Sequence, residues 1–536
     1  MPWATGWKPL ILAAAMTLSP AASALAEEGK PSLDDLLAER LAEQELTLRA
    51  FYAARDGRPA WQEAATVAAL ANALRTLDAD GLSPQDYRPD TLVAAHRQAL
   101  AEQSPPAAQA RFDLQTSQTL LTALRHLQRG KVDPYRIDPG WEVPIEAPPL
   151  DLAAISQAVD ARRFEQAFAA ARPSVAPYER LRASLARYRH IARQGGWPMM
   201  PPRPRSLRPG ELHDDVPLLR ERLAILGELE VMARVSDAPA SQVTDPRRYD
   251  ERLVAAVERF QQRHLLEVDG IVGPATREAL NVPVATRIDQ IRVNLERARW
   301  LLHGLPDSFV LVDIAGYRIR YYRPDGGVWR SRIVVGRPYR RTPSLRSRIT
   351  HLTINPTWTV PPTILREDVL PRVRRNLGYL WQQDLMVLSP SGRRLDPRDV
   401  NWWRPGNVIL RQRAGPQNAL GRVVLRFPND HLVYLHDTPA QALFAREQRA
   451  FSSGCIRVQG VLELAQYLFD DTGTAAQVST LVAAGRTRNV HLERPVPVIL
   501  HYWTVHPDEA GQLVFRPDIY QRDSALLAAL DALPAG

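Results

Sequence analysis

The sequence predicts a multidomain α+β protein with a helical N-terminal scaffold, a small three-helix domain and a mainly-β C-terminal domain that carries an insertion. Three observations support this prediction. At 536 residues the chain is too long for a single hydrophobic core. In the N-terminal third, apolar residues recur three and four positions apart, as on one face of a helix. From Asp307 onward they alternate, which is typical of strands.

The first 26 residues have the order of a secretory signal peptide. Lys8 precedes an apolar run from Leu10 to Leu18, and Ala-Leu-Ala follows at 24–26. Because the run is too short to span a bilayer comfortably, we expect residues 1–26 to be a signal that exports the protein to the periplasm. An uncleaved membrane anchor is the alternative. No later segment is apolar enough to cross a membrane, so no stable span is expected after cleavage.

The net charge of +9 predicts an acidic partner. The chain has no zinc-finger spacing, RNP-like motif or basic-aromatic stripe, so we do not expect it to bind nucleic acid. His491, His501 and His506 lack a convincing ligand set, so no metal site is expected. An anionic membrane surface and an acidic polymer are the remaining kinds of partner.

Residues 27–200 are predicted to form the helical scaffold. The helical patterns run from about Leu33 to Gly195, and "DADGLSPQDY" and "WEVPIEAPPL" are expected to be loops between helices. No paired carboxylates or metal-ligand spacings stand out here. The proline-rich stretch from Trp197 to Gly210 is expected to be a linker.

Residues 208–283 contain the helix-starting and helix-ending residues that are typical of a small helical domain. One helix pattern ends at Gly227, and Pro274 stands where another helix would start. The stretch "AAVERFQQRHLLEVDGIVGPATREAL" (Ala255 to Leu280) resembles the three-helix peptidoglycan-binding domain of cell-wall enzymes. A helical spacer that binds nothing is the alternative. A connecting helix is predicted over 284–306.

Residues 307–536 are predicted to form the β-rich domain. Alternating strands are joined by a "PDGG" turn, and the chain closes with a hairpin in "PVPVILHYWTVHPDEAGQLVFRPDIY". Residues 362–421 are a long insertion between two strands.

Cys455 is the only cysteine of a chain that we expect to be exported, so it has no disulfide partner within the chain. A lone cysteine is either an inert hydrophobic residue or a thiol kept for its reactivity. His436, 19 positions earlier, is the candidate base. We expect Cys455 to lie just before the "VLELAQYL" helix, where backbone N–H groups would stabilise a thiolate and an oxyanion. Gly454 would let the backbone approach the substrate closely.

The stretch "YLHDTPAQALFAREQRAFSSGCIRVQGVLELAQYL" (Tyr434 to Leu468) resembles the YkuD-type L,D-transpeptidase catalytic domain. "FYAARDGRPAW" and "DADGLSPQDY" are similar to the scaffold of its long periplasmic YcbB-like branch, so the resemblance covers almost the entire mature chain. One position departs from the commoner family pattern, because Ser453 stands where histidine usually precedes the glycine.

The resemblance implies that Cys455 attacks a tetrapeptide stem of peptidoglycan, releases D-alanine and forms a thioester. The side-chain amine of a second stem then resolves the thioester into a 3→3 cross-link. His436 would serve as base and then acid, oriented by a backbone carbonyl. No step requires a metal or cofactor. The family also implies acylation of Cys455 by carbapenems, and it implies that the insertion at residues 362–421 is a capping subdomain.

Further residues are candidates for binding the substrate or shaping the site. Tyr434 would bond near the acyl carbonyl or pack across strands. Arg457 would bind a stem carboxylate or brace the loop. Of these two roles, bracing the loop is the favoured one. Ser453 belongs to the same motif, while Ser452 and Trp358 are candidates around the thiol, and Trp358 is as compatible with a core position.

Other functions share this pattern. A cysteine peptidase or carboxypeptidase would hydrolyse the same thioester, and D-amino-acid exchange would use the same acyl-enzyme. A wall-binding scaffold with an inactive catalytic domain is the non-enzymatic alternative, although an intact His436 and Cys455 argue against it. Tetrapeptide stems are the expected partners, and other cell-wall synthases are further candidates.

Overall fold

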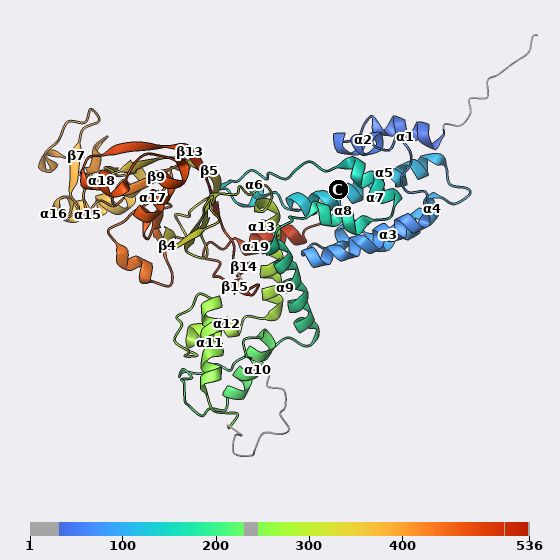
Figure 1. The fold of residues 1–536 in the computed structure, drawn as a ribbon, viewed down its shortest axis with the longest axis horizontal. Coiled ribbons are helices and arrows are strands. Elements are labelled where there is room, and N and C mark those ends of the chain that lie inside the picture. Colours follow the sequence, from blue (N-terminus) through green and yellow to red (C-terminus); the bar gives the residue numbers. More distant parts are fainter. Residues whose placement is uncertain (1–31, 230–244, 509, 534–536) are drawn as a thin grey trace, which may run out of the picture.

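The computed structural model describes residues 32–229, 245–508 and 510–533 (Figure 1). Within these residues the predicted multidomain α+β architecture is confirmed, with a helical N-terminal region, a small helical domain and a β-rich C-terminal domain. The predicted signal peptide, 1–26, lies outside the described residues. Among the described helices, none is long and apolar enough to cross a membrane.

The N-terminal scaffold is built around the long helix α5, which is buried along one face. The connection after α6 (Pro134–Ile137), expected to be entirely loop, contains a two-residue strand, β1 (Trp141–Glu142). This strand pairs in parallel with β5 (Ser344–Ile354) of the C-terminal domain. The scaffold helices are α1 (Leu33–Leu41), α2 (Leu46–Ala53), α3 (Ala64–Arg75), α4 (Pro89–Ala99), α5 (Pro106–Arg129), α6 (Pro134–Ile137), α7 (Leu152–Asp160), α8 (Phe164–Ala171) and α9 (Ala176–Arg193).

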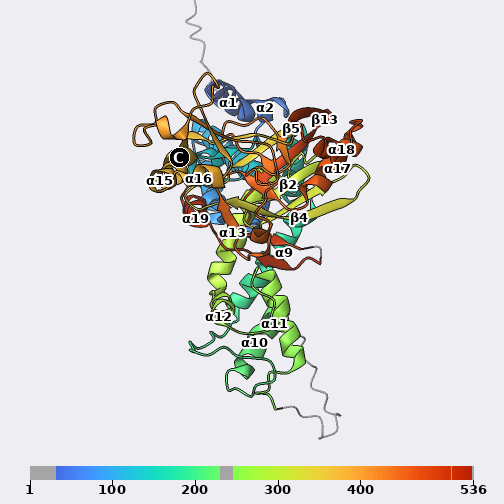
Figure 2. The same cartoon turned by 90° about the vertical axis from the view of Figure 1, so that its left-hand side faces the viewer.

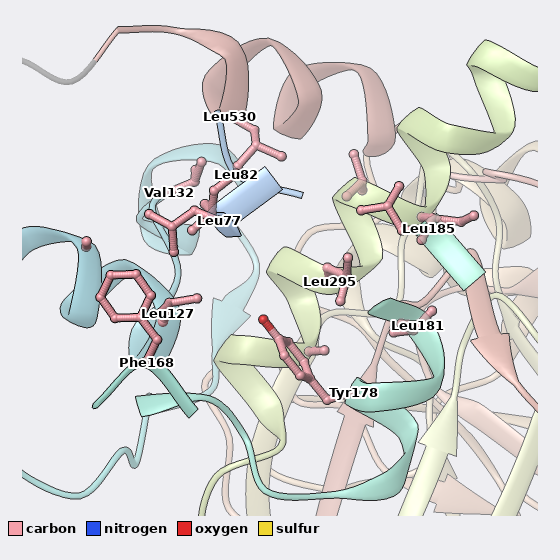
Figure 3. Close-up of a cluster of buried hydrophobic side chains, with 14 of the residues drawn as sticks. Leu77, Leu82, Leu127, Val132, Phe168, Tyr178, Leu181, Leu185, Leu295 and Leu530 are labelled. Carbon is pink, nitrogen blue, oxygen red and sulfur yellow. The ribbon is translucent and has the colours of Figure 1, made fainter. Parts of the chain in front are cut away.

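Helix α13 (Val284–Leu301) joins the scaffold to the C-terminal domain. It packs along α9, and the C-terminal helix α19 (Asp523–Asp531) packs against it. Figure 3 shows Leu181 of α9, Leu295 of α13 and Leu530 of α19 in one cluster of buried side chains. The same cluster contains Leu37 of α1, so the two ends of the described chain share one core, although the sequence did not predict α19.

An ion pair is buried within this junction. Arg299 and Glu296 are both fully buried, and Arg299 Nε donates to Glu296 Oε2 at 3.1 Å. Glu296 Oε1 accepts the Val132 N–H at 2.6 Å. Arg299 also donates to the Asp80 carbonyl and the Tyr178 hydroxyl. The network links α13 to three separate parts of the scaffold.

Replacing Glu296 by alanine is expected to destabilise the fold by about 3–5 kcal/mol, because it leaves the buried Arg299 charge without a counter-ion. Glu296→Gln keeps an acceptor for Val132 and should cost less. Chemical denaturation of the full chain measures the loss, with Glu39→Ala at an exposed position of α1 as the control. Equal stability of Glu296→Ala and the control would contradict the structural role.

The small helical domain contains α10 (Val216–Leu226), α11 (Glu251–Arg263) and α12 (Pro274–Leu280). As predicted, α10 ends at Gly227, whose φ of 73° is left-handed, and Pro274 is the first residue of α12. Figures 1 and 2 both show this domain projecting from the junction of the other two. In this domain the ring of His264 stacks on the ring of Phe515 in the C-terminal hairpin, with 5.5 Å between the ring centroids.

The β-rich domain is formed by a sheet that closes on itself, because β9 pairs with both β10 and β5. Helix α17 (Val461–Thr472) packs its apolar face into the same core, followed by α18 (Val478–Ala483). The strands are β2 (Phe309–Asp313), β3 (Arg318–Tyr322), β4 (Val328–Gly336), β5 (Ser344–Ile354), β9 (Val423–Arg426), β10 (Leu435–His436), β11 (Ala450–Ser452), β12 (Ile456–Val458) and β13 (Arg488–His501), with the predicted hairpin β14 (Val505–Pro507) and β15 (Leu513–Phe515).

The predicted insertion has a hydrophobic cluster and a small sheet of its own. The sheet begins at Trp358, four residues before the predicted boundary at Pro362, because Trp358 and Thr359 pair with Gln412 and Arg411. We call residues 358–421 the cap. Its elements are β6 (Trp358–Thr359), α14 (Pro362–Ile364), a π-helical turn (Leu365–Val369), α15 (Leu370–Arg375), α16 (Gly378–Gln382), β7 (Leu385–Leu388) and β8 (Ile409–Gln412).

Candidate active site

Strands β9, β10 and β12 lie side by side and bring the candidate residues together. Leu435 is opposite both Ile456 and Leu425, and all three belong to the core of the domain. Because side chains alternate along a strand, the residues on either side of these three point to the opposite face. That face carries two rows across the three strands: Cys455, Tyr434 and Arg426 in one, and Arg457, His436 and Val424 in the next.

The surroundings of Cys455 differ from the predicted loop-to-helix junction. The strand β12 follows the cysteine directly, and α17 begins only at Val461. Ile456 and Val458 point into the core, so this short segment is held as a strand between β4 and β10. The predicted contribution of a helix N-terminus to the thiol is therefore wrong.

The Cys455 thiol is half-buried, and its Sγ lies 3.9 Å from the Leu432 carbonyl oxygen. Burial raises the pKa of the thiol. The backbone and hydroxyl groups of Tyr434 act in the opposite direction, as do the charges of Arg426 and Arg457. The resting nucleophile is a neutral thiol, with Tyr434 in position to stabilise negative charge on it.

His436 is 4% exposed and lies on the same face as Cys455, one diagonal step away. Its Nδ1–H donates to the Asp437 carbonyl at 2.5 Å, which leaves Nε2 as the unprotonated nitrogen. Burial, followed by the charge of Arg457, lowers the pKa of His436 to about 3. The imidazole is therefore neutral at physiological pH and able to accept a proton, although the thiol bonds to Leu432 in this state.

Ser452 closes the corner that presents the thiol. Its hydroxyl donates to the Cys455 carbonyl at 2.5 Å and accepts the Gly454 N–H at 3.1 Å. Gly454 has a φ of 115°, which favours glycine. Because its N–H is occupied by Ser452, Gly454 contributes the shape of the corner, and this N–H is not free to stabilise an oxyanion.

Ser452→Ala is expected to slow reaction at the thiol by roughly 100-fold, because a displacement of the nucleophile by ~1 Å has that effect. Ser452→Thr keeps a hydroxyl and should recover part of the rate. The rate of acylation of Cys455 measures the effect. Ser331→Ala is the matched control, since its hydroxyl donates to the Gln459 carbonyl at the other end of β12. A loss shared by that control would contradict the argument.

Thr342 and Arg340, which the sequence did not single out, hold the same corner. Thr342 is fully buried and donates to the Gly454 carbonyl at 2.8 Å. Arg340 donates to the exposed Ser453 hydroxyl at 2.8 Å. Both lie in the stretch "RPYRRTPSL" (Arg337 to Leu345), although nothing in the stretch alone indicates which of its polar residues turn towards the thiol.

Arg340 also ties the corner to the cap. It donates to Glu367 at 2.8 Å and forms an ion pair with Asp368, both in the π-helical turn. Trp358 packs against the hydrophobic cluster of the cap, which agrees with the alternative of a core position. The other predicted residues lie on or next to β10, on β12 or in the corner that precedes β12.

Comparisons with known proteins agree with this fold. Residues 307–483 match the family model described as the L,D-transpeptidase catalytic domain, YkuD. Residues 46–185 match a scaffold domain, and 213–280 match a "Putative peptidoglycan binding domain". The chain thus carries a YkuD-type L,D-transpeptidase catalytic domain together with a peptidoglycan-binding domain, as the sequence predicts.

The chain is also similar to a protein of Haemophilus influenzae (strain ATCC 51907 / DSM 11121 / KW20 / Rd) named "Putative L,D-transpeptidase". The two are 34% identical over 240 residues, which cover 44% of this chain and 48% of the relative. The chain thus matches about half the length of that relative.

Proposed function

We propose that this protein is an exported L,D-transpeptidase that forms 3→3 cross-links between peptidoglycan stems through a thioester on Cys455. The observation that carries the proposal is the placement of a half-buried thiol and a buried, neutral histidine on one face of adjacent strands in a YkuD-type domain. The basic chain suits a substrate rich in carboxylates.

In the first half-reaction, Cys455 Sγ attacks the carbonyl that joins the L-centre of diaminopimelate to the terminal D-alanine. The thiol proton passes to His436 Nε2, and the C–S bond forms as the carbonyl becomes an oxyanion. Collapse of this intermediate breaks the C–N bond. His436 returns the proton to the leaving amine, so that D-alanine departs and the thioester remains.

In the second half-reaction, the side-chain amine of another stem attacks the thioester. His436 takes a proton from this amine and gives it to the departing sulfur, which restores the thiol. The hydroxyl of Tyr434 is within hydrogen-bond reach of Cys455 and is our candidate donor to negative charge at the reacting atoms.

The cap is proposed to keep water from the thioester and so to favour cross-linking over hydrolysis. Arg340→Ala cuts the link between the cap and Ser453, so we expect more hydrolysed stem relative to dimer. Loss of one charge-assisted hydrogen bond, ~1.5 kcal/mol, corresponds to roughly a 10-fold change in this ratio. Arg366→Ala, in the same turn but bonded only to Glu367, is the control. An unchanged ratio would contradict a role in excluding water.

The peptidoglycan-binding domain is proposed to hold the enzyme on its polymeric substrate, in the periplasm. Tetrapeptide stems are the proposed partners, together with other cell-wall synthases.

The proposal is tested by incubating purified protein with disaccharide-tetrapeptide and analysing the products by mass spectrometry. A dimer lighter than two monomers by one D-alanine is the expected product. Shortened monomer without dimer would favour a carboxypeptidase or peptidase, and incorporation of an added D-amino acid would favour exchange. No reaction at all would overturn the enzymatic proposal in favour of a wall-binding scaffold.

A further inference from the structure

Arg426 is the last residue of β9 and lies in the same row as Tyr434 and Cys455. Its guanidinium carbon is 4.5 Å from the centroid of the Tyr434 ring. Stacking on an aromatic face fixes the plane of a guanidinium and leaves its N–H groups at the edge free to bind a planar anion. Tyr434, which contacts the thiol, thus also holds Arg426 in place.

The charge of Arg426 reaches both reacting groups. It favours the thiolate of Cys455 and disfavours the imidazolium of His436, as does Arg457 on the other side of the site. The strand register agrees, because Arg426 lies in the row of Tyr434 and Cys455, and Arg457 lies opposite His436.

Neither arginine forms an ion pair with a carboxylate of the described residues. Asp437, the acid beside His436, accepts instead from the backbone N–H of Arg422 at 2.9 Å, and Arg422 Nε lies 3.7 Å from it. The Nε atom of Arg457 is buried without a hydrogen-bond partner in the described structure. Both arginines are half-buried, and a partly desolvated cation without a counter-ion gains from an anion that arrives from outside.

We propose that Arg426 binds a free carboxylate of the donor stem next to the scissile amide, with Arg457 adding charge from the opposite side. The inference rests on the proposed function. Two carboxylates of a tetrapeptide stem share the required chemistry: that of the terminal D-alanine and that of the D-centre of diaminopimelate. Bidentate contact with an arginine gives a carboxylate both affinity and a fixed orientation, which here would align the carbonyl with Cys455.

The test measures D-alanine or D-alaninamide release by full-length wild type, Arg426→Gln and a control, Arg97→Gln. Arg97 is exposed on scaffold helix α4, so the control removes the same charge far from the site. Three donors are compared: the free tetrapeptide, the same stem amidated at the terminal D-alanine, and the stem amidated at the D-centre of diaminopimelate.

For wild type and Arg97→Gln, we expect kcat/KM to be ~10- to 100-fold higher with the free donor than with one of the amidated donors. This is the effect expected when a charge-assisted hydrogen bond is lost. Arg426→Gln should lose this preference by slowing on the free donor alone. Which amide is discriminated identifies the carboxylate.

Three results would overturn the inference. Arg426→Gln could slow all donors equally, which would mean a structural role, or it could leave every rate unchanged. Wild type could also turn over all three donors equally. A complete lack of turnover by wild type is distinct from these, because it overturns the proposed function itself.

Discussion

Cys455→Ser is expected to abolish D-alanine release from tetrapeptide donors, with a fall of at least ~10³-fold in rate. The serine hydroxyl occupies nearly the same place, but it is a far weaker nucleophile than a thiol and a poorer leaving group in the second half-reaction. Since Cys455 is the only cysteine in the chain, no other thiol can replace it. Release of D-alanine by wild type and variant, measured side by side, checks the expectation.

The intact mass of the protein tests the same prediction independently. Wild type mixed with donor should gain the mass of the stem less D-alanine, and a carbapenem should give an adduct on Cys455. Neither adduct should form on Cys455→Ser, while the thermal midpoint of the variant should match that of wild type. A dimeric product made by Cys455→Ser would contradict the thioester mechanism.

The sequence identified the nucleophile and the base because both are rare residues in a specific motif. Cys455 is unique in the chain, and His436 ends a strand pattern before a loop. Their local surroundings were harder to predict. Three residues, Ile456–Val458, are too few to show alternation, so the strand that separates the thiol from α17 was missed.

Contacts between distant segments account for the other differences. Arg426 meets Tyr434 only because β9 pairs with β10, and the register of that pairing depends on the whole sheet. Trp141 pairs with Ser344 for the same kind of reason, because a two-residue strand is formed by its partner and not by its own propensity. The helical scaffold and the domain around Gly227 and Pro274 were predictable because apolar periodicity and the residues that start and end helices are visible within a short stretch of sequence.

His436→Ala is expected to slow acylation of Cys455 by ~10²- to 10⁴-fold, because the thiol then loses the base that takes its proton. His436→Gln should be equally slow, since an amide cannot accept the proton, although it retains polarity in the buried site. Acylation is measured as the single-turnover release of D-alanine, which leaves the acceptor amine out of the reaction. A variant that acylates at the wild-type rate would contradict the role of His436 as base.

The pH dependence follows from the direction of two pKa shifts. With the pKa of His436 lowered to about 3 and that of Cys455 raised, the imidazole and the thiol both stay neutral through the mildly acidic range. Single-turnover acylation should therefore change little between pH ~5 and ~7.5, where a free histidine would lose most of its basic form. A steep loss near pH ~6.5 would indicate a solvent-exposed histidine and contradict this geometry.

Stability, by contrast, should respond to acid in that same range. The unfolded chain protonates this histidine near pH ~6.5, whereas the folded site does so only near 3, so the contribution of His436 is complete above pH ~6.5 and is lost as the pH falls. At pH ~5 the loss amounts to about 2 kcal/mol. His436→Gln should thus narrow the difference in thermal midpoint between pH 7.5 and pH 5. The burial that keeps the base neutral and reactive in acid is the same burial that makes the fold sensitive to acid.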